Sequence, residues 1–191
     1  AMYLGAQVLF RSLDDGQSWN TVSPDLSGKR EGVGPCHDPS WEEARACGYG
    51  VVFTIAPSPR DTAVIWVGTD DGLVKRTSDG GAHWQDVTPP GLPAWGIVSS
   101  IDLSPNDPAT VYVAVDAHRL DRFSPLAFAT HDGGRTWRTI SRGLPADEFA
   151  TVVRCDRKRK GLLYAGTNRS VYVSFDDGER WQPLARGFPT T

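Results

Sequence analysis

Long apolar runs are missing from this sequence. Its 191 residues are 39% hydrophobic, but the apolar stretches are as short as residues 51–56, far below the roughly 20 residues that a membrane-spanning helix needs. Residues 1–6 have neither a charged region nor a long apolar one, so we expect no signal peptide there. The sequence predicts no membrane partner.

Basic charge is also scarce. The formal net charge is −3, and 23% of the residues are charged. The only basic cluster, residues 157–160, lies between two apolar stretches, where a solvated turn is the simpler interpretation. We therefore expect no nucleic-acid partner.

Cysteine is too rare to form a disulfide framework, because the chain has only three. Cys155 falls in an apolar run and is expected in the core. For Cys36 and Cys47, free thiols, a disulfide and a zinc site remain open. A helix between them would separate them by on the order of 12 Å, a disulfide needs Cα atoms within about 7 Å, and zinc lacks a fourth ligand with suitable spacing. Cysteine usage does not determine the compartment.

The chain is rich instead in one repeated octet, Ser/Thr-x-Asp-x-Gly-x-x-Trp. Recurrence of one turn-plus-aromatic unit is typical of proteins built from stacked supersecondary modules. The four octets comprise Ser12, Asp14, Gly16 and Trp19; Thr77, Asp79, Gly81 and Trp84; Thr130, Asp132, Gly134 and Trp137; and Ser174, Asp176, Gly178 and Trp181.

Four short runs of β-branched or aromatic residues surround each octet, separated by Pro, Gly, Asp and Asn. This pattern predicts an all-β fold, a β-propeller segment of about four four-stranded blades with the octet between the third and fourth strands. The runs at 52–55 and 98–103 are the most continuously apolar, so we expect these first strands to be packed on both faces. We place the blades at approximately 1–23 (partial), 51–88, 97–141 and 149–185 of a single segment, 1–191, with an insertion at 24–50.

The residue types of the octet suit a compact turn. Asp and Ser or Thr can bond to nearby backbone groups, Gly permits positive φ, and Trp can bury its ring between sheets while its N–H finds an acceptor. One or two carboxylates per loop are too few for the usual six to eight oxygens around calcium. We expect no metal and no cofactor.

These octets resemble the Asp-box, or bacterial neuraminidase repeat, of sialidases, some glycoside hydrolases and sortilin-type propellers. The stretches 67–73, 162–167 and 171–178 are most similar to large bacterial sortilin-type repeat proteins, which are often labelled glycosyl hydrolase. The resemblance implies an extracytoplasmic or secreted location. It carries over no catalytic residue, because no sialidase arginine motif surrounds Arg119, Arg122 or Arg169, and the fold alone does not specify an activity.

Irregular loops gather on the face that we expect to lie opposite the octets, and such loops tend to carry function. In the longest of them, Asp38 or Ser40 is expected to cap a helix over 41–46 that Gly48 ends. The predicted binding face comprises Trp41, Tyr49, Trp95, His118, Arg119, Arg122, Asn168 and Arg169.

Acidic residues on the same face allow a catalytic alternative. Inverting glycosidases need two carboxyls roughly 6.5–9.5 Å apart, one with a raised pKa. Asp70 or Asp71 with Asp121 or Glu148 could supply such a pair. The competing interpretation is a charged rim in solvent.

The first blade contains no run that could form its inner strand. We expect the remaining blades of a larger propeller, or a second copy closing the ring, to cover the open sheets. The function hypotheses are a non-catalytic segment that binds a protein, peptide or glycan, part of a sialidase-like or xyloglucanase-like hydrolase, and a purely structural segment.

Overall fold

Four antiparallel sheets form the computed structural model, which describes residues 1–28 and 40–184. The first sheet contains β1 (Met2–Gly5), β2 (Leu9–Ser12) and β3 (Asn20–Thr21). The second contains β4 (Val52–Pro57), β5 (Ile65–Thr69), β6 (Val74–Thr77) and β7 (Gln85–Asp86). The third contains β8 (Ile97–Leu103), β9 (Val111–Asp116), β10 (Leu126–Thr130) and β11 (Arg138–Thr139). The fourth contains β12 (Ala150–Cys155), β13 (Leu163–Thr167), β14 (Val171–Ser174) and β15 (Gln182–Pro183).

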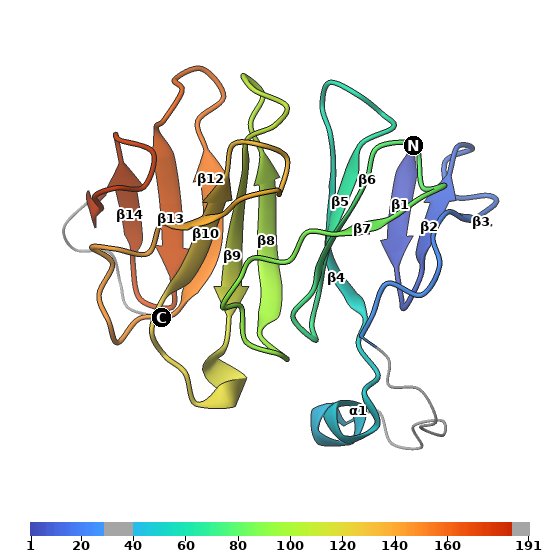
Figure 1. The fold of residues 1–191 in the computed structure, drawn as a ribbon, viewed down its shortest axis with the longest axis horizontal. Coiled ribbons are helices and arrows are strands. Elements are labelled where there is room, and N and C mark those ends of the chain that lie inside the picture. Colours follow the sequence, from blue (N-terminus) through green and yellow to red (C-terminus); the bar gives the residue numbers. More distant parts are fainter. Residues whose placement is uncertain (29–39, 185–191) are drawn as a thin grey trace.

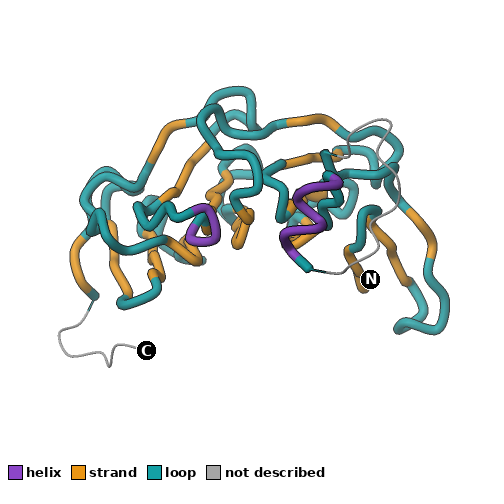
Figure 2. Tube along the Cα trace, turned by 90° about the horizontal axis from the view of Figure 1, so that it is seen from below, coloured by secondary structure: helices purple, strands orange, loops and turns teal. Residues whose placement is uncertain are grey.

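Each sheet is a meander in which strands adjacent in sequence pair, as the four runs per unit predict. The sheets stand side by side (Figure 1) and follow an arc that is open on one side (Figure 2). Along this arc β8 contacts both β4 and β12. The helical elements are α1 (Trp41–Cys47) and the 3₁₀ turn η1 (His118–Leu120). In the described part of the chain, no helix has the length and apolar character needed to cross a membrane.

The core lies between sheets and is centred on the middle strands. Every residue of β5 and β10 is buried. In contrast, Phe53 of β4 is 56% exposed. The expectation that the first strands are packed on both faces is therefore wrong for β4. Edge position alone does not explain this exposure, because β8 is also an edge strand and five of its seven residues are buried. The difference lies in packing against neighbouring sheets, since β8 contacts both β4 and β12.

The four octets form the same hydrogen-bonded turn. In the first, the Ser12 hydroxyl donates to Asp14 Oδ1 at 2.8 Å and accepts from Gly16 N at 2.8 Å. Asp14 Oδ1 also accepts from Ser18 N at 2.9 Å. The other three octets repeat these bonds at 2.8–3.0 Å. The side chains thus close the turn locally, as the residue types predict.

Accepting these bonds lowers the pKa of the octet aspartates. Bonds from Ser18 bring the pKa of Asp14 from 3.8 to about 2, and bonds from Thr136 do the same for Asp132. A carboxyl whose pKa is lower in the folded state binds its proton more weakly there than in the unfolded chain. The octets therefore contribute stability above about pH 4, and this contribution is lost as the pH falls towards 2.

We expect the double variant Asp14→Asn/Asp132→Asn to be less stable than the wild type near neutral pH. It should also lose less stability on acidification, since two of the titrating carboxyls are gone. Urea midpoints measured at neutral pH and across the window from 3.8 to about 2 would check this. An unchanged acid profile in the variant would contradict a stabilising role for these carboxylates.

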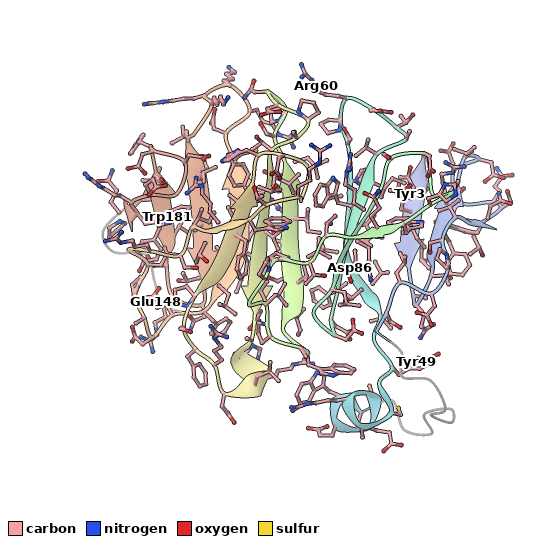
Figure 3. All side chains as sticks on the ribbon, in the orientation of Figure 1. Tyr3, Tyr49, Arg60, Asp86, Glu148 and Trp181 are labelled. Carbon is pink, nitrogen blue, oxygen red and sulfur yellow. The ribbon has the colours of Figure 1, made fainter. Side chains whose placement is uncertain are left out.

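The octets and the irregular loops lie on opposite faces. Octet amides donate to the turns between the first and second strands, from Gly80 to Ala63 and from Gly133 to Ala109, both at 2.9 Å. Arg60, in one of these turns, is at the upper end of Figure 3, whereas Tyr49 and Glu148 are in its lower half. Helix α1 lies at the lower end of Figure 1. The prediction that the variable loops face away from the octets is confirmed by this arrangement.

Candidate functional site

Helix α1 forms where the sequence places its capping residues. Ser40 is the N-cap, and its hydroxyl accepts from Glu43 N at 3.3 Å. Gly48 ends the helix with φ 67°, in the left-handed region that glycine adopts without a steric penalty. Asp38, the alternative cap, lies outside the described residues. The predicted helix at 41–46 is confirmed and extends one residue further, to Cys47.

Of the three states that the sequence leaves open for Cys47, the structure has the disulfide and not the free thiol or the zinc ligand. Cys36 lies outside the described residues. Cys155 is free and half-buried on β12, where it packs against the core cluster of the third and fourth sheets.

A groove of about 570 Å³ runs between α1 and the loop that joins the second and third sheets. The Trp41 ring carries the Arg45 guanidinium over its face, with the carbon 5.3 Å from the ring centre. Two tryptophans and two alanines supply apolar surface, and exposed Glu42 and Arg45 add charges of both signs. The lining residues are Trp41, Glu42, Arg45, Ala46, Ala94 and Trp95.

Trp95 is held in an unusual backbone conformation. Its φ is 66°, a left-handed value that is rare for a bulky residue. The Trp95 amide donates to the Asp71 carbonyl at 2.8 Å, which fixes the loop against the connection between β5 and β6. Such strain persists only where the surroundings impose it and occurs often at ligand sites. The Trp41 indole nitrogen, in turn, is buried without a hydrogen-bond partner among the described residues.

Asp70 and Asp71 lie in the connection between β5 and β6, against which the 89–96 loop is fixed. Asp71 is buried, and its Oδ2 accepts from Gly28 N at 2.6 Å. Asp71 Oδ1 is buried with no partner in the described part of the chain. Asp70 accepts from Val51 N at 2.7 Å. Burial raises the pKa of Asp70 and the Asp71 carboxylate adds to the rise, while the bond from Val51 and the charge of Arg119 oppose it.

An aromatic cluster surrounds η1 in the third sheet. The His118 ring stacks on Phe149, with the ring centres 4.8 Å apart, and Phe123 lies 6.4 Å from Phe149. His118 Nδ1 is 2.7 Å from Asp116 Oδ1, which orients the ring. Phe123 is 51% exposed. Arg119 and Arg122 are exposed, and Asp121 caps η1 with φ 56°. This cluster offers a second apolar surface on the loop face.

The predicted site residues of the fourth sheet form hydrogen bonds and an ion pair within that sheet and its loops. Glu148 is buried and accepts from Thr167 Oγ1 at 2.6 Å and from the Tyr172 hydroxyl at 3.0 Å. Arg169 pairs with Asp147 at 2.6 Å on the surface. The Asn168 amide donates to the Phe149 carbonyl at 3.2 Å. Glu148 thus ties the loop before β12 to β13 and β14.

The structure brings Trp41 and Trp95 together in the groove, and the positive charge of Arg119 acts to lower the pKa of Asp70. Tyr49 is 39% exposed just beyond α1. Phe123 and Phe149 were missed by sequence reasoning. Phe149 directly follows Glu148, and Phe123 lies in the long 116–125 hairpin. Their position as aromatic residues in irregular loops was the sequence signal that could have identified them. No group of three or more His, Cys, Asp or Glu within residues 1–28 and 40–184 is arranged to hold a metal ion.

No protein-family model matches the chain, and a search of the curated proteins also finds no match. Solved structures do match. An ancestral GH74 enzyme superposes with a TM-score of 0.67 over 96% of this chain at 20% identity. The GH74 xyloglucanase from Xanthomonas campestris gives 0.65 over 98% at 17% identity. YCF48 bound to D1 peptide gives 0.54 over 70% at 20% identity.

The chain spans 22%, 29% and 39% of the length of these three structures, in the same order. At such identities the likeness concerns the fold. Together with four meander sheets in an arc, it identifies the chain as an all-β, β-propeller segment.

Proposed function

We propose that this chain is a non-catalytic β-propeller segment of a larger repeat protein, comparable to sortilin-type Asp-box propellers, and that its loop face binds a protein, peptide or glycan. One observation carries the proposal. The groove between α1 and the 89–96 loop presents the rings of Trp41 and Trp95 beside the charged side chains of Glu42 and Arg45, so its lining combines aromatic and polar surface. Ligand sites typically combine aromatic side chains with a few polar groups that set the orientation of the ligand.

Rigidity supports this groove as a binding site. Ser40 and Gly48 cap the two ends of α1, and the bond from Trp95 N to Asp71 O holds the opposite wall. Pre-organised walls reduce the ordering cost of binding. The YCF48 structure holds a D1 peptide on a related fold, which supports a peptide as one class of ligand.

A second candidate is a glycoside hydrolase, favoured by the raised pKa of Asp70 beside Asp71. A carboxyl of this kind suits a general acid. Two similar folds are GH74 enzymes, one of them a xyloglucanase. Against this candidate, Glu148 is occupied by Thr167 and Tyr172.

We expect Trp41→Ala and Trp95→Ala each to weaken ligand binding by at least about tenfold, as buried aromatic anchors commonly do. Peptide and glycan arrays on the full chain would identify the ligand, and calorimetry would measure its affinity. Phe175→Ala is the matched control, because Phe175 is 50% exposed on an octet. Thermal melts would verify that each variant folds.

Two results would count against the binding proposal: no array member bound, or equal loss in Phe175→Ala. The hydrolase candidate is tested separately by incubating the chain with oligosaccharides and assaying new reducing ends. It predicts turnover that Asp70→Asn abolishes, whereas the binding proposal predicts none.

A further inference from the structure

A second cleft, of about 870 Å³, lies on the octet face between the second and third sheets. Strands β6 and β7 of the second sheet form one wall, and the octet of the third sheet forms the other. Its volume falls in the range of ligand pockets, roughly 300–1,000 Å³. The charged residues in its lining are Arg76, Asp86, Asp132 and Arg135, and we call it the arginine cleft.

The two arginines of the cleft have no acidic partner in the described part of the chain. Neither Arg76 nor Arg135 forms an ion pair with any residue of 1–28 or 40–184. Arg135 is exposed and Arg76 is partly buried. The guanidinium carbon of Arg76 lies 5.8 Å from the centre of the Trp66 ring, a contact that orients the cation. Both positive charges are therefore available to a ligand.

The two aspartates of the cleft are bound to other groups. Asp86 pairs with Lys75 at 2.8 Å. Asp132 accepts from Thr136 N at 2.9 Å and from Thr136 Oγ1 at 2.6 Å, within its own octet. These carboxylates thus do not neutralise the two arginines by direct contact.

The boundary between the third and fourth sheets shows how this protein binds carboxylates. There Arg138 pairs with Asp177 and, at 3.0 Å, with Glu179. Asp177 also accepts from the Tyr112 hydroxyl at 2.5 Å and lies 2.8 Å from His131 Nε2. Cationic and hydroxyl groups of one sheet therefore bind two carboxylates that the octet of the next sheet supplies.

The octet of the third sheet lacks these two carboxylates. Asp177 and Glu179 are the fourth and sixth residues of their octet, where the third sheet has Gly133 and Arg135. A Cβ on Gly133 would lie 3.8 Å from the guanidinium carbon of Arg76. A carboxylate attached at this position would be within reach of that guanidinium. The arginine cleft therefore has the cations of such a boundary and no carboxylate from its own octet to bind them.

We propose that the arginine cleft binds the carboxylates of an acidic peptide, with Arg76 and Arg135 as the cationic groups. Guanidinium groups bind carboxylates through two parallel N–H···O bonds. The ligand is a peptide because the group that occupies the neighbouring boundary is itself a short turn, residues 176–179, with carboxylates on three of its four residues. The cleft is on the face opposite the α1 groove, so the inference does not depend on the function proposed for that groove.

Titration of a dye-labelled, capped Asp-Asp-Gly-Glu peptide with the full chain, followed by fluorescence anisotropy, tests this inference. The peptide should bind at least about tenfold more tightly than its neutral counterpart Asn-Asn-Gly-Gln, and Arg76→Gln or Arg135→Gln should weaken binding by a similar factor. Arg142→Gln is the matched control, because Arg142 is an exposed arginine in the loop between β11 and β12. Thermal melts would verify that each variant folds.

Gly133→Asp provides a sharper test, because it adds a carboxylate to the cleft. Aspartate already has a left-handed backbone at this octet position, with φ 58° at Asp15 and 61° at Asp177, compared with 75° at Gly133. The variant should therefore fold. Its carboxylate should compete with the peptide and weaken binding by at least about tenfold, whereas Gly133→Asn, of the same size but uncharged, should weaken it by less than about threefold.

Three results would overturn the inference: no binding of the acidic peptide, equal binding of the neutral one, or equal losses in Gly133→Asp and Gly133→Asn. A galacturonic acid oligomer that binds more tightly than the peptide would assign the carboxylate to a saccharide and would also overturn it. Trp41→Ala and Trp95→Ala should leave binding of this peptide unchanged, because both residues line the α1 groove. Failure at the arginine cleft can thus be distinguished from failure of the proposed function.

Discussion

Gly81→Ala is expected to lower the free energy of unfolding by about 4 kcal/mol, since it combines steric overlap, a positive φ and loss of a hydrogen bond. Gly81 has φ 109°, and an added Cβ would overlap the carbonyl oxygen of Val22. That carbonyl is backbone and cannot move aside as a flexible side chain could. The Trp84 indole bonds to the same carbonyl at 3.2 Å, so separation of the first two sheets breaks this bond too.

Gly91→Ala separates the steric part from the conformational part. Gly91 has φ 84°, similar to Gly81, but a Cβ there would meet nothing within 4 Å. We expect it to cost only about 1 kcal/mol, the backbone penalty alone. Urea unfolding followed by tryptophan fluorescence would compare the two. Equal losses would contradict the view that Gly81 is required by the contact between sheets.

Trp66→Ala is expected to cost about 3–5 kcal/mol, as large aromatic deletions in cores do. Trp66 is fully buried on β5 in the core shared by the second and third sheets. Its ring meets Trp137 edge-on, with the centroids 6.3 Å apart and the planes at 87°. The deletion therefore opens a cavity at a sheet junction and removes one half of an aromatic pair.

Trp66→Phe is the matched variant. The indole nitrogen of Trp66 is buried with no hydrogen-bond partner among the described residues, so phenylalanine removes an unsatisfied donor while keeping a ring in place. We expect it to lose less than half as much stability as Trp66→Ala in urea denaturation. If the two variants were equally unstable, ring packing would not account for the role of Trp66.

The elements that the sequence predicts well are those determined by local chemistry. The octet bonds join residues two to four positions apart, so Ser12, Asp14 and Gly16 reveal the turn without knowledge of the rest. The same holds for α1, whose Ser40 and Gly48 caps are adjacent to the helix. The alternating runs predict the four meanders for a similar reason, because each strand pairs with its sequence neighbour.

The parts that the sequence does not predict depend on contacts across the chain. The left-handed backbone of Trp95 follows from its bond to Asp71, 24 positions earlier. The stacking of His118 on Phe149 joins two irregular loops whose relative position no local pattern defines. The exposure of Phe53 depends on how the neighbouring sheets pack against β4. The roles of the predicted site residues stay predictions, because the sequence does not identify the ligand that they would bind.

Three octet tryptophans donate their indole N–H groups to backbone carbonyls of the preceding sheet. The residues that carry these carbonyls are Val22, Val87 and Ile140, and Leu184 holds the equivalent position in the fourth sheet. Every residue has such a carbonyl, so the contact tolerates substitution on the side that accepts. This one contact can therefore be kept when units are exchanged, whereas side-chain contacts such as Trp66 with Trp137 differ from one boundary to the next. Gene duplication or deletion could lengthen or shorten such a protein by whole units while this backbone contact is kept at each new boundary.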